Sequence, residues 1–179
     1  MKLVIITGMQ GAGKGVLSDA FSSVGFPVII MGDVIRAEAI RRGLEPNPEN
    51  TKKVMLELRA TGGPGAVALR CIDELKAECA ETVVIEGCRS IAEIDVFDDY
   101  AESLTIICVH ASPFTRFERL KFRARDDAPP DWATFRERDL REISVGLGGV
   151  IALSDIMLVN EDSLEDMEQV SIKVTKRFL

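Results

Sequence analysis

The segment from Leu3 to Val16, LVIITGMQGAGKGV, is an apolar run followed by a glycine-rich loop that contains a lysine. The run from Leu3 to Ile6 is continuous and aliphatic, which is typical of a strand buried on both faces of a parallel sheet. From Gly8 the pattern is GxxxxGK, the signature of a loop that binds phosphate groups through its backbone. After this loop, apolar residues recur at helical spacing, at positions 17, 20, 21 and 24. The segment therefore predicts a strand, a phosphate loop (residues 8–15) and a helix, in that order.

The composition of the phosphate loop suits an anionic ligand. Its glycines permit positive φ values and a close backbone approach, so that successive N–H groups and the helix N-terminus converge on phosphate oxygens, and Lys14 adds a positive charge. A flexible glycine turn is the alternative, but it requires neither the strand before the loop nor the helix after it. The residue after Lys14 is Gly15, followed by Val16, where such loops have a Ser or Thr that holds magnesium. Magnesium must then be held without that hydroxyl.

Length and composition indicate one cytoplasmic globular domain. With 179 residues, 46% of them hydrophobic and 28% charged, the chain suits one domain of about five strands with helices. The net charge of −7 argues against general affinity for nucleic acid or for an anionic membrane. Four cysteines without a C-x-x-C pair, beside one histidine, argue against a zinc site. Strand residues directly follow Met1 and Lys2 and no apolar run approaches a membrane span, so we expect no leader, no membrane association and reduced thiols.

A second apolar run, Pro27 to Met31, predicts another short buried strand. Gly32 and Asp33 follow it, at the carboxyl end of the strand, where open α/β sheets place their ligand-binding groups. A helix then begins, and Arg36 lies on it. Asp33 is either the N-cap of this helix or part of a binding site, and Arg36 is either a solvated side chain or a phosphate ligand.

Residues 44–65 are predicted to form a mobile flap. Asn47 and Pro48 suit the N-cap and the first position of a helix that extends to about residue 60. The sequence TGGPG at residues 61–65 ends that helix, and a further helix is expected over residues 68–79. Because breakers flank the first helix, we expect this segment to move when a ligand binds.

A third buried strand is predicted from Thr82 to Ile85, and it ends in the sequence EGCR. An acid at the carboxyl end of a strand beside a phosphate loop is well placed to hold magnesium through water. The alternative for Glu86 is an ion pair with a lysine. Arg89, three residues further, favours the functional interpretation.

Two more strands are predicted, from Leu104 to Val109 and from Ser154 to Val159. Between them, Ser112 and Pro113 suit the N-cap and first position of a helix. The last helix extends to the C-terminus, and we expect its apolar residues in the core: Leu164, Met167, Val170, Ile172 and Val174.

The segment from Ser112 to Arg125 reverses the charge of the chain, because it contains five basic residues and one acidic residue. Arg116, Arg119 and Arg123 recur at i, i+3 and i+7, which places them on one helix face that can lean over a polyphosphate. The sequence DDAPPD at residues 126–131 ends this helix. Another helix follows, and acids among its arginines indicate that some are ordinary surface pairs: Arg136, Arg138 and Arg141.

Four motifs together resemble the nucleoside monophosphate kinase superfamily, which includes adenylate and UMP/CMP kinases and is related to dephospho-coenzyme A kinases. They are the phosphate loop, MGDVIR at residues 31–36, EGCR at 86–89 and ERLKFR at 118–123. The resemblance extends over nearly the whole chain, and it is closer still to a group of archaeal proteins described as kinase-related. The sequence SDIMLVN at residues 154–160 is most similar to dephospho-coenzyme A kinases. Two substrate classes are therefore indicated by different parts of the chain.

The resemblance implies roles for individual residues. It implies ATP binding by Gly8, Met9, Gln10, Gly11, Ala12, Gly13, Lys14, Gly15, Val16 and Arg119, with Arg119 near the donor base. It implies a magnesium site at Glu86, through water, and acceptor binding by Asp33, Arg36 and Arg89. It implies catalytic contacts from Lys14, Arg89, Arg123, Arg125 and Arg138.

The fold implied by this resemblance is a three-layer α/β P-loop domain over residues 1–179, with a five-stranded parallel sheet in the order 2-3-1-4-5. It has a helical acceptor insertion at residues 33–80 and a short lid at residues 116–141. The implied activity is that of a transferase, a kinase that moves the γ-phosphoryl group of ATP to a nucleotide-type acceptor, either a nucleoside monophosphate or dephospho-coenzyme A, with Mg²⁺ as cofactor, in a monomer or homodimer. The alternative is a nucleotide-switched ATPase that acts in the assembly of a larger particle.

Overall fold

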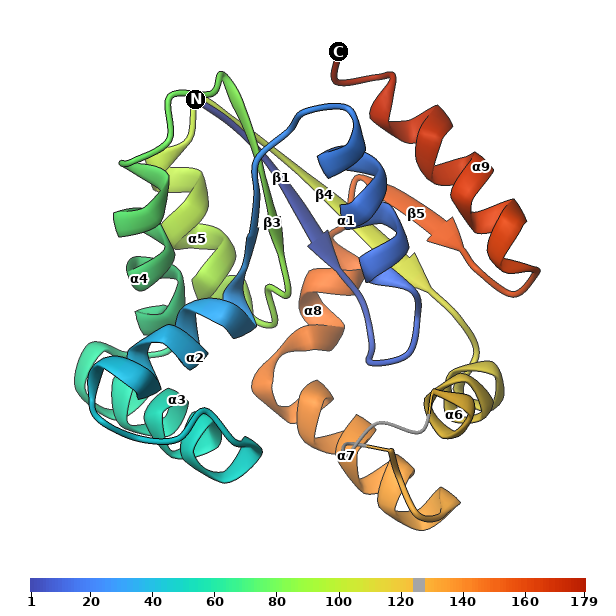
Figure 1. Cartoon of the computed structure of the whole chain (residues 1–179), viewed down its shortest axis with the longest axis horizontal. Helices are drawn as coiled ribbons and strands as arrows, with labels where there is room; N and C mark the ends of the chain where they lie inside the picture. The colour runs from blue at the N-terminus through green and yellow to red at the C-terminus, as the bar shows by residue number, and fades with distance from the viewer. Residues whose placement is uncertain (124–127) are drawn as a thin grey trace.

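Five parallel strands form one sheet at the centre of the molecule, in the order β2-β3-β1-β4-β5 (Figure 1). The computed structural model describes residues 1–123 and 128–179. Over these residues the strand order and the parallel pairing confirm the expected P-loop fold. The strands are β1 (Lys2–Thr7), β2 (Val28–Ile30), β3 (Thr82–Glu86), β4 (Ser103–His110) and β5 (Ile156–Val159).

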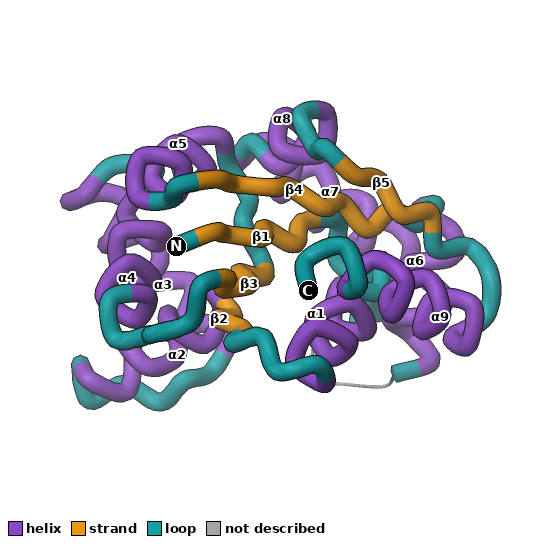
Figure 2. Tube along the Cα trace, turned by 90° about the horizontal axis from the view of Figure 1, so that it is seen from above, coloured by secondary structure: helices purple, strands orange, loops and turns teal. Residues whose placement is uncertain are grey.

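Alternate residues of β1 point to opposite faces of the sheet, and each face carries its own hydrophobic cluster. Leu3 and Ile5 belong to a cluster with the helices that lie within residues 31–100 and with the helix of residues 147–152. Val4 and Ile6 belong to a second cluster with the helices of residues 14–23 and 164–175. All four side chains are buried, so β1 is covered on both sides, as its continuous aliphatic sequence predicted. Figure 2 shows the sheet between these two groups of helices.

The helices begin at residues that their sequences favour. Asn47 caps α3 by accepting from the backbone N–H of Asn50, with Pro48 at the first position, and Ser112 caps α6 in the same way, with Pro113 after it. Both caps confirm the prediction. The helices are α1 (Lys14–Ser23), α2 (Met31–Arg41), α3 (Pro48–Gly62), α4 (Ala66–Leu75), α5 (Ile91–Tyr100), α6 (Pro113–Phe122), α7 (Trp132–Val145), α8 (Leu147–Ala152) and α9 (Leu164–Thr175).

Helices α6 and α7 form a separate pair at the carboxyl end of the sheet. Phe117, Leu120 and Phe135 make a small hydrophobic cluster between them, and the Trp132 ring lies edge-on to Phe117 with 5.3 Å between the ring centroids. The pair therefore packs through its own core, beside the two clusters that cover the sheet.

Several sequence expectations require correction. Met31 was expected to end the second strand, but it begins α2, because its buried side chain packs in the core at the start of the helix. Asp33 consequently lies in the first turn of α2 and is not its N-cap, which is Ile30. In α9, Leu164, Val170 and Ile172 are exposed, and the buried positions include two hydroxyl residues, Ser171 and Thr175. Helices α5 and α8 were not anticipated.

The described part of the chain contains no helix with both the length and the apolar character that crossing a membrane requires.

Candidate phosphoryl-transfer site

The phosphate loop follows β1 and leads into α1, and its glycines are held by close contacts. Gly8 and Gly13 have φ values of 137° and 104°, in the region that favours glycine. A Cβ on Gly8 would lie 2.2 Å from the carbonyl oxygen of Val109, and a Cβ on Gly13 would lie 2.3 Å from Nδ2 of Asn160. The loop therefore lies so close to the ends of β4 and β5 that neither Gly8 nor Gly13 has room for a side chain.

Lys14, the first residue of α1, folds back over the phosphate loop. Its Nζ donates to the carbonyl oxygens of Gly8 at 2.9 Å and Met9 at 3.3 Å. Burial lowers the pKa of Lys14 to about 8; the negative charge of Glu86 opposes this shift and the positive charge of Arg89 adds to it. A phosphate oxyanion beside this ammonium group would provide the opposite charge that favours its protonated form.

The residues after Lys14 provide no hydroxyl group, but a serine lies one helical turn further. Gly15 has open space around it and Val16 is apolar. The Oγ of Ser18 donates to Oε2 of Glu86, the last residue of β3, at 2.5 Å. Among the described residues no basic side chain forms an ion pair with Glu86, which disfavours the lysine-pair interpretation of this residue.

The oxygens of Ser18 and Glu86 suit a magnesium ion. Magnesium prefers oxygen ligands and keeps several water molecules, so it needs few protein groups. Within residues 1–123 and 128–179 there is no cluster of three or more His, Cys, Asp or Glu side chains that would hold a metal ion by itself. A magnesium ion at Glu86 would therefore take most of its ligands from water and from phosphate.

Asn160, directly after β5, anchors the phosphate loop and a lid arginine. Its side chain is buried, Nδ2 donates to the carbonyl oxygen of Ala12 at 2.8 Å, and its backbone N–H donates to His110 at 2.7 Å. Arg119 donates to the carbonyl oxygens of Asn160 and Asp162, at 2.9 Å and 3.1 Å. Arg119 thus lies beside the phosphate loop, against the turn that follows β5.

Arg89 contacts two helices directly, α5 and α7, and a third helix, α3, through Glu93. Its backbone N–H donates to the buried carboxylate of Glu93 on α5 at 2.7 Å, and the other oxygen of Glu93 accepts from Nη2 of Arg59 on α3 at 2.9 Å. The Arg89 side chain donates to Glu142 on α7 at 3.0 Å. In the described part of the structure, the buried Nε of Arg59 has no hydrogen-bond partner.

Arg36 and Asp33, both expected on the acceptor side, pair with each other. They lie one turn apart on α2, are both exposed, and Nε of Arg36 donates to Oδ1 of Asp33 at 2.9 Å. An exposed pair of this kind contributes little to stability, on the order of 0–1 kcal/mol, so an acceptor anion can replace Asp33 at small cost.

Arg116 differs from the expectation that it shares a polyphosphate-facing surface with Arg119 and Arg123. It is buried and makes a bidentate ion pair with Asp139 on α7, with N–O distances of 2.9 Å and 2.6 Å. Its Nη1 also donates to the carbonyl oxygen of Gln10 at 3.2 Å. Arg116 therefore joins α6, α7 and the phosphate loop.

The other lid arginines lie in different environments. Arg123 is exposed at the end of α6, and its charge contributes to the lowered pKa of Lys14. Arg138 is half-buried on α7. Arg125 lies outside the described residues.

Ser18, Glu142 and Asn160 are among the residues of this site that were not singled out from the sequence. Ser18 lies four residues after Lys14 on a predicted helix, so helical spacing alone would have placed it on the same side. Asn160 directly follows a predicted strand, at the edge of the sheet where ligand groups gather. Glu142 is one of several acids on its helix and carries no such signal.

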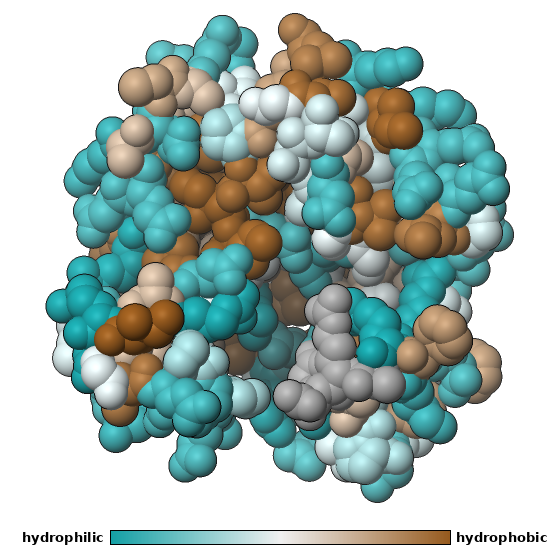
Figure 3. All heavy atoms as spheres, in the orientation of Figure 1, coloured by the Kyte–Doolittle hydropathy of each residue, from teal (hydrophilic) through white to brown (hydrophobic). Residues whose placement is uncertain are grey.

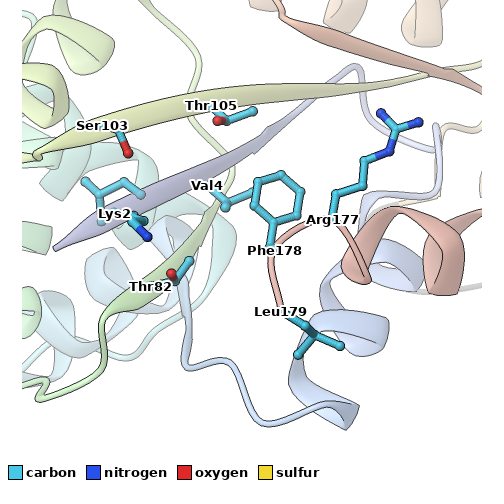
Figure 4. A pocket seen from close by; sticks show the side chains of 9 residues that line it. Lys2, Val4, Thr82, Ser103, Thr105, Arg177, Phe178 and Leu179 are labelled. Atoms are coloured by element: carbon cyan, nitrogen blue, oxygen red, sulfur yellow. The ribbon is translucent and has the colours of Figure 1, made fainter.

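The face in front of the site is hollowed. Figure 3 shows a hollow below the carboxyl ends of the strands, between the side that carries α2 and α3 and the side that carries α6 and α7. A separate depression of about 310 Å³ lies at the other end of the sheet, lined by strand starts such as Lys2, Thr82 and Ser103 and by the C-terminal residues Phe178 and Leu179 (Figure 4). It is therefore remote from the phosphate loop.

Relatives of the chain identify its family. A UPF0200 protein of Hyperthermus butylicus is 45% identical over 175 residues, which cover 98% of this chain and 94% of the relative. The chain belongs to the UPF0200 family. Another member, from Thermococcus kodakarensis, is 44% identical and covers 93% of this chain and 92% of its own length. Residues 7–136 of this UPF0200 chain also match the family model described as AAA domain. The expected membership in an archaeal family of the P-loop kinase group is thereby confirmed.

Solved structures of low sequence identity share the UPF0200 fold. A shikimate kinase of Bacteroides thetaiotaomicron has a TM-score of 0.65 at 18% identity and covers 98% of this chain and 97% of its own. The protein TT1252 of Thermus thermophilus has a TM-score of 0.66 at 20% identity, with 99% and 97% covered. A gluconokinase of Sinorhizobium meliloti has a TM-score of 0.59 at 14% identity, with 99% and 93% covered. The fold is that of small-molecule P-loop kinases.

Proposed function

We propose that the protein is an ATP-dependent small-molecule kinase that transfers the γ-phosphoryl group to a nucleotide-type acceptor, a nucleoside monophosphate or dephospho-coenzyme A. The observation that carries this proposal is that the phosphate loop with Lys14, and the two arginines Arg36 and Arg89, follow the carboxyl ends of neighbouring strands, β1, β2 and β3. In the proposal, the phosphate loop and Lys14 bind the donor, and Arg36 and Arg89 bind the acceptor. Phosphoryl transfer needs mainly positioning and charge neutralisation, which these groups supply.

On the donor side, the backbone N–H groups of residues 11–15 and the start of α1 would bind the phosphate oxygens of ATP. Lys14 would leave the carbonyl groups that it now contacts and pair with those oxygens. Arg119 would lie beside the adenine base, and Arg123, Arg125 and Arg138 would approach the transferred group from the lid.

On the acceptor side, Arg36 and Arg89 would bind the anionic group of the acceptor. Each now has a carboxylate partner, Asp33 and Glu142, and the acceptor phosphate would take the place of these carboxylates. A guanidinium group suits this exchange because its planar fork binds a carboxylate or a phosphate equally well. Arg89 is the better fixed of the two, since Glu93 holds its backbone.

Magnesium, when bound, would neutralise charge that develops on the phosphate oxygens during transfer. Glu86 would hold it through a water molecule, and the phosphate loop would hold the oxygens on its other side. The lid would exclude water from the reacting groups, so that transfer to the acceptor outpaces hydrolysis.

One observation favours the alternative, a nucleotide-switched ATPase that acts in the assembly of a larger particle. Three aromatic side chains on α6 and α7 are exposed: Phe114 by 67%, Phe122 by 92% and Trp132 by 42%. Exposed aromatic residues of this kind are typical of surfaces that contact another macromolecule. In a switch, such contacts would transmit the nucleotide state of the loop.

Product analysis tests the proposal. ATP consumption by the purified protein is measured alone and with each nucleoside monophosphate and with dephospho-coenzyme A, and GTP is compared as donor. We expect one acceptor to raise turnover many-fold and to appear as a phosphorylated product. Lys14→Ala should abolish this turnover without loss of fold, and Lys173→Ala, at an exposed lysine on α9, should not change it. Turnover that responds to no small acceptor would contradict the kinase proposal and favour the switch.

A further inference from the structure

The carboxylate at the end of β3 is oriented by a hydroxyl group that the phosphate-loop motif does not include. Ser18 is buried on α1, only 5% exposed, and its Oγ lies 2.5 Å from Oε2 of Glu86. The same hydroxyl lies 3.3 Å from the carbonyl oxygen of Lys14. Because the contact with the carboxylate is the shorter one and the carboxylate carries a charge, the Ser18 proton is directed to Glu86.

This hydrogen bond leaves one oxygen of Glu86 available. Oε2 is occupied by Ser18, whereas in the described part of the chain no hydrogen bond reaches Oε1. Ser18 lies one turn after Lys14 on α1, so the carboxylate that it contacts lies beside the start of this helix, next to the phosphate loop. A half-buried carboxylate with one fixed and one available oxygen is oriented for a ligand.

Ser18 and Glu86 are the same two kinds of residue, a hydroxyl residue and a strand-end carboxylate, that hold magnesium in other P-loop enzymes. The hydroxyl residue lies further along the helix in this chain. In P-loop enzymes a Ser or Thr of the loop and a strand-end carboxylate hold magnesium together. Here the loop positions are Gly15 and Val16, and the nearest hydroxyl on that side of α1 is that of Ser18, one turn after Lys14. Glutamate is one methylene longer than aspartate, which gives Glu86 additional reach from the strand end.

We propose that Ser18 is a positioning residue for magnesium. Its hydroxyl fixes the Glu86 carboxylate so that the available oxygen accepts a hydrogen bond from the water shell of a magnesium ion bound with the nucleotide. Ser18 thereby contributes a hydroxyl to the metal site through Glu86, whereas the Ser or Thr of other phosphate loops, absent here at Gly15 and Val16, holds the metal itself. The inference rests on the proposed function to the extent that the loop must bind a metal–nucleotide complex, and it does not depend on which acceptor is used.

A metal titration tests this inference. The full-length protein is saturated with ADP, and Mn²⁺ is added while free Mn²⁺ is followed by electron paramagnetic resonance. We expect Ser18→Ala to weaken Mn²⁺ binding to the ADP complex about tenfold, as is typical for loss of a partner that orients a metal-holding group. Glu86→Gln should weaken it at least as much. Binding of ADP without metal should be the same in all variants, since in this proposal both side chains act on the metal and its water shell and not on the nucleotide.

Two comparisons separate positioning from a structural role. Ser171→Ala also removes a buried serine hydroxyl, on α9, which packs against α1, and it should leave Mn²⁺ affinity unchanged. Ser18→Thr keeps the hydroxyl and should retain most of the affinity. Parent-like Mn²⁺ affinity in a folded Ser18→Ala variant would overturn the inference. If the parent complex binds Mn²⁺ but phosphorylates no acceptor, the kinase proposal fails, and the metal affinities still decide the role of Ser18.

Discussion

Nη1 of Arg89 donates a 3.0 Å hydrogen bond to Oε1 of Glu142, which joins the loop after β3 to helix α7. Arg89 belongs to the expected acceptor side and Glu142 to helix α7, most of which lies within the expected lid. An acceptor anion that binds Arg89 must therefore compete with a carboxylate of this helix.

Replacement of Glu142 should favour the acceptor. Glu142→Gln removes the competing charge, and half-exposed pairs of this kind are worth at most about 1 kcal/mol, so we expect the KM for a phosphorylated acceptor to fall by up to about fivefold. The kcat should change little. Glu137→Gln is the matched control, because Glu137 forms a similar 3.1 Å pair with Arg141 on the same helix but none with Arg89. A KM that rises would show instead that Glu142 holds Arg89 in its binding orientation.

Nucleotide affinity should depend on pH through Lys14. Burial lowers its pKa to about 8 in the free protein, and the phosphate charges would raise that pKa in the complex. Above pH 8 the free protein has lost this proton and must take one up to bind, so affinity should fall by about tenfold per pH unit until the pKa of the complex is reached. Below pH 8 this dependence should be absent.

Calorimetric titration of ADP at pH 9, in two buffers that differ in ionisation enthalpy, measures this proton uptake. Lys14→Arg is the control, because its guanidinium group remains protonated in this range. Equal proton uptake by parent and variant would assign the titration to another group.

Substitution of Arg36 and substitution of Arg123 should affect different substrates, the acceptor and ATP respectively. Arg36→Ala should weaken acceptor binding or transfer by about 1–3 kcal/mol, the usual contribution of a charge-assisted hydrogen bond, and should leave ATP affinity unchanged. Arg123→Ala should reduce transfer to every acceptor, because in the proposed function Arg123 acts on the ATP that all acceptors share. ATP affinity and acceptor-dependent turnover are measured for both. If Arg36→Ala weakens ATP binding as much as Arg123→Ala does, the acceptor site is wrongly placed.

Glycine substitutions should distinguish the packed part of the phosphate loop from its open part. Gly13→Ala introduces a Cβ 2.3 Å from Nδ2 of Asn160, at a φ of 104°, and should lower the free energy of unfolding by at least about 2 kcal/mol. Gly15→Ala introduces a Cβ with no atom within 4 Å, in the first turn of α1, and should be neutral or stabilise by up to about 1 kcal/mol. Urea unfolding of both variants measures the difference. Similar losses for the two would mean that the contact with Asn160 does not restrict the loop.

The elements with strong local signals were predicted from the sequence. Continuous aliphatic runs predicted the five strands, and the resemblance to the kinase superfamily implied their parallel arrangement and their order, which the structure confirms. Helix starts were predicted where a capping side chain and a proline coincide, as at Asn47 and Ser112. Helix α5 was missed because its apolar residues alternate with acids, so that no clear periodic face stands out in IAEIDVFDDY.

The interactions of the site were less predictable than its location. Arg116 has the helical spacing of a ligand-facing arginine, but its role was decided by Asp139, 23 residues away on another helix. The pairing of Arg89 with Glu142 likewise depends on how α7 packs. Such partners are set by tertiary structure, and one sequence does not reveal which of several acids on a helix will face a given arginine.

The bond from Asn160 to Ala12 joins positions that are 148 residues apart. During synthesis the phosphate loop leaves the ribosome well before Asn160 does. The contact between Asn160 and the phosphate loop can therefore form only after β5 has been synthesised. A nascent or truncated chain that ends before Asn160 lacks this support, so we expect it to bind nucleotide more weakly than a chain that includes Asn160. We therefore expect nucleotide to stabilise only chains in which Asn160 has been synthesised.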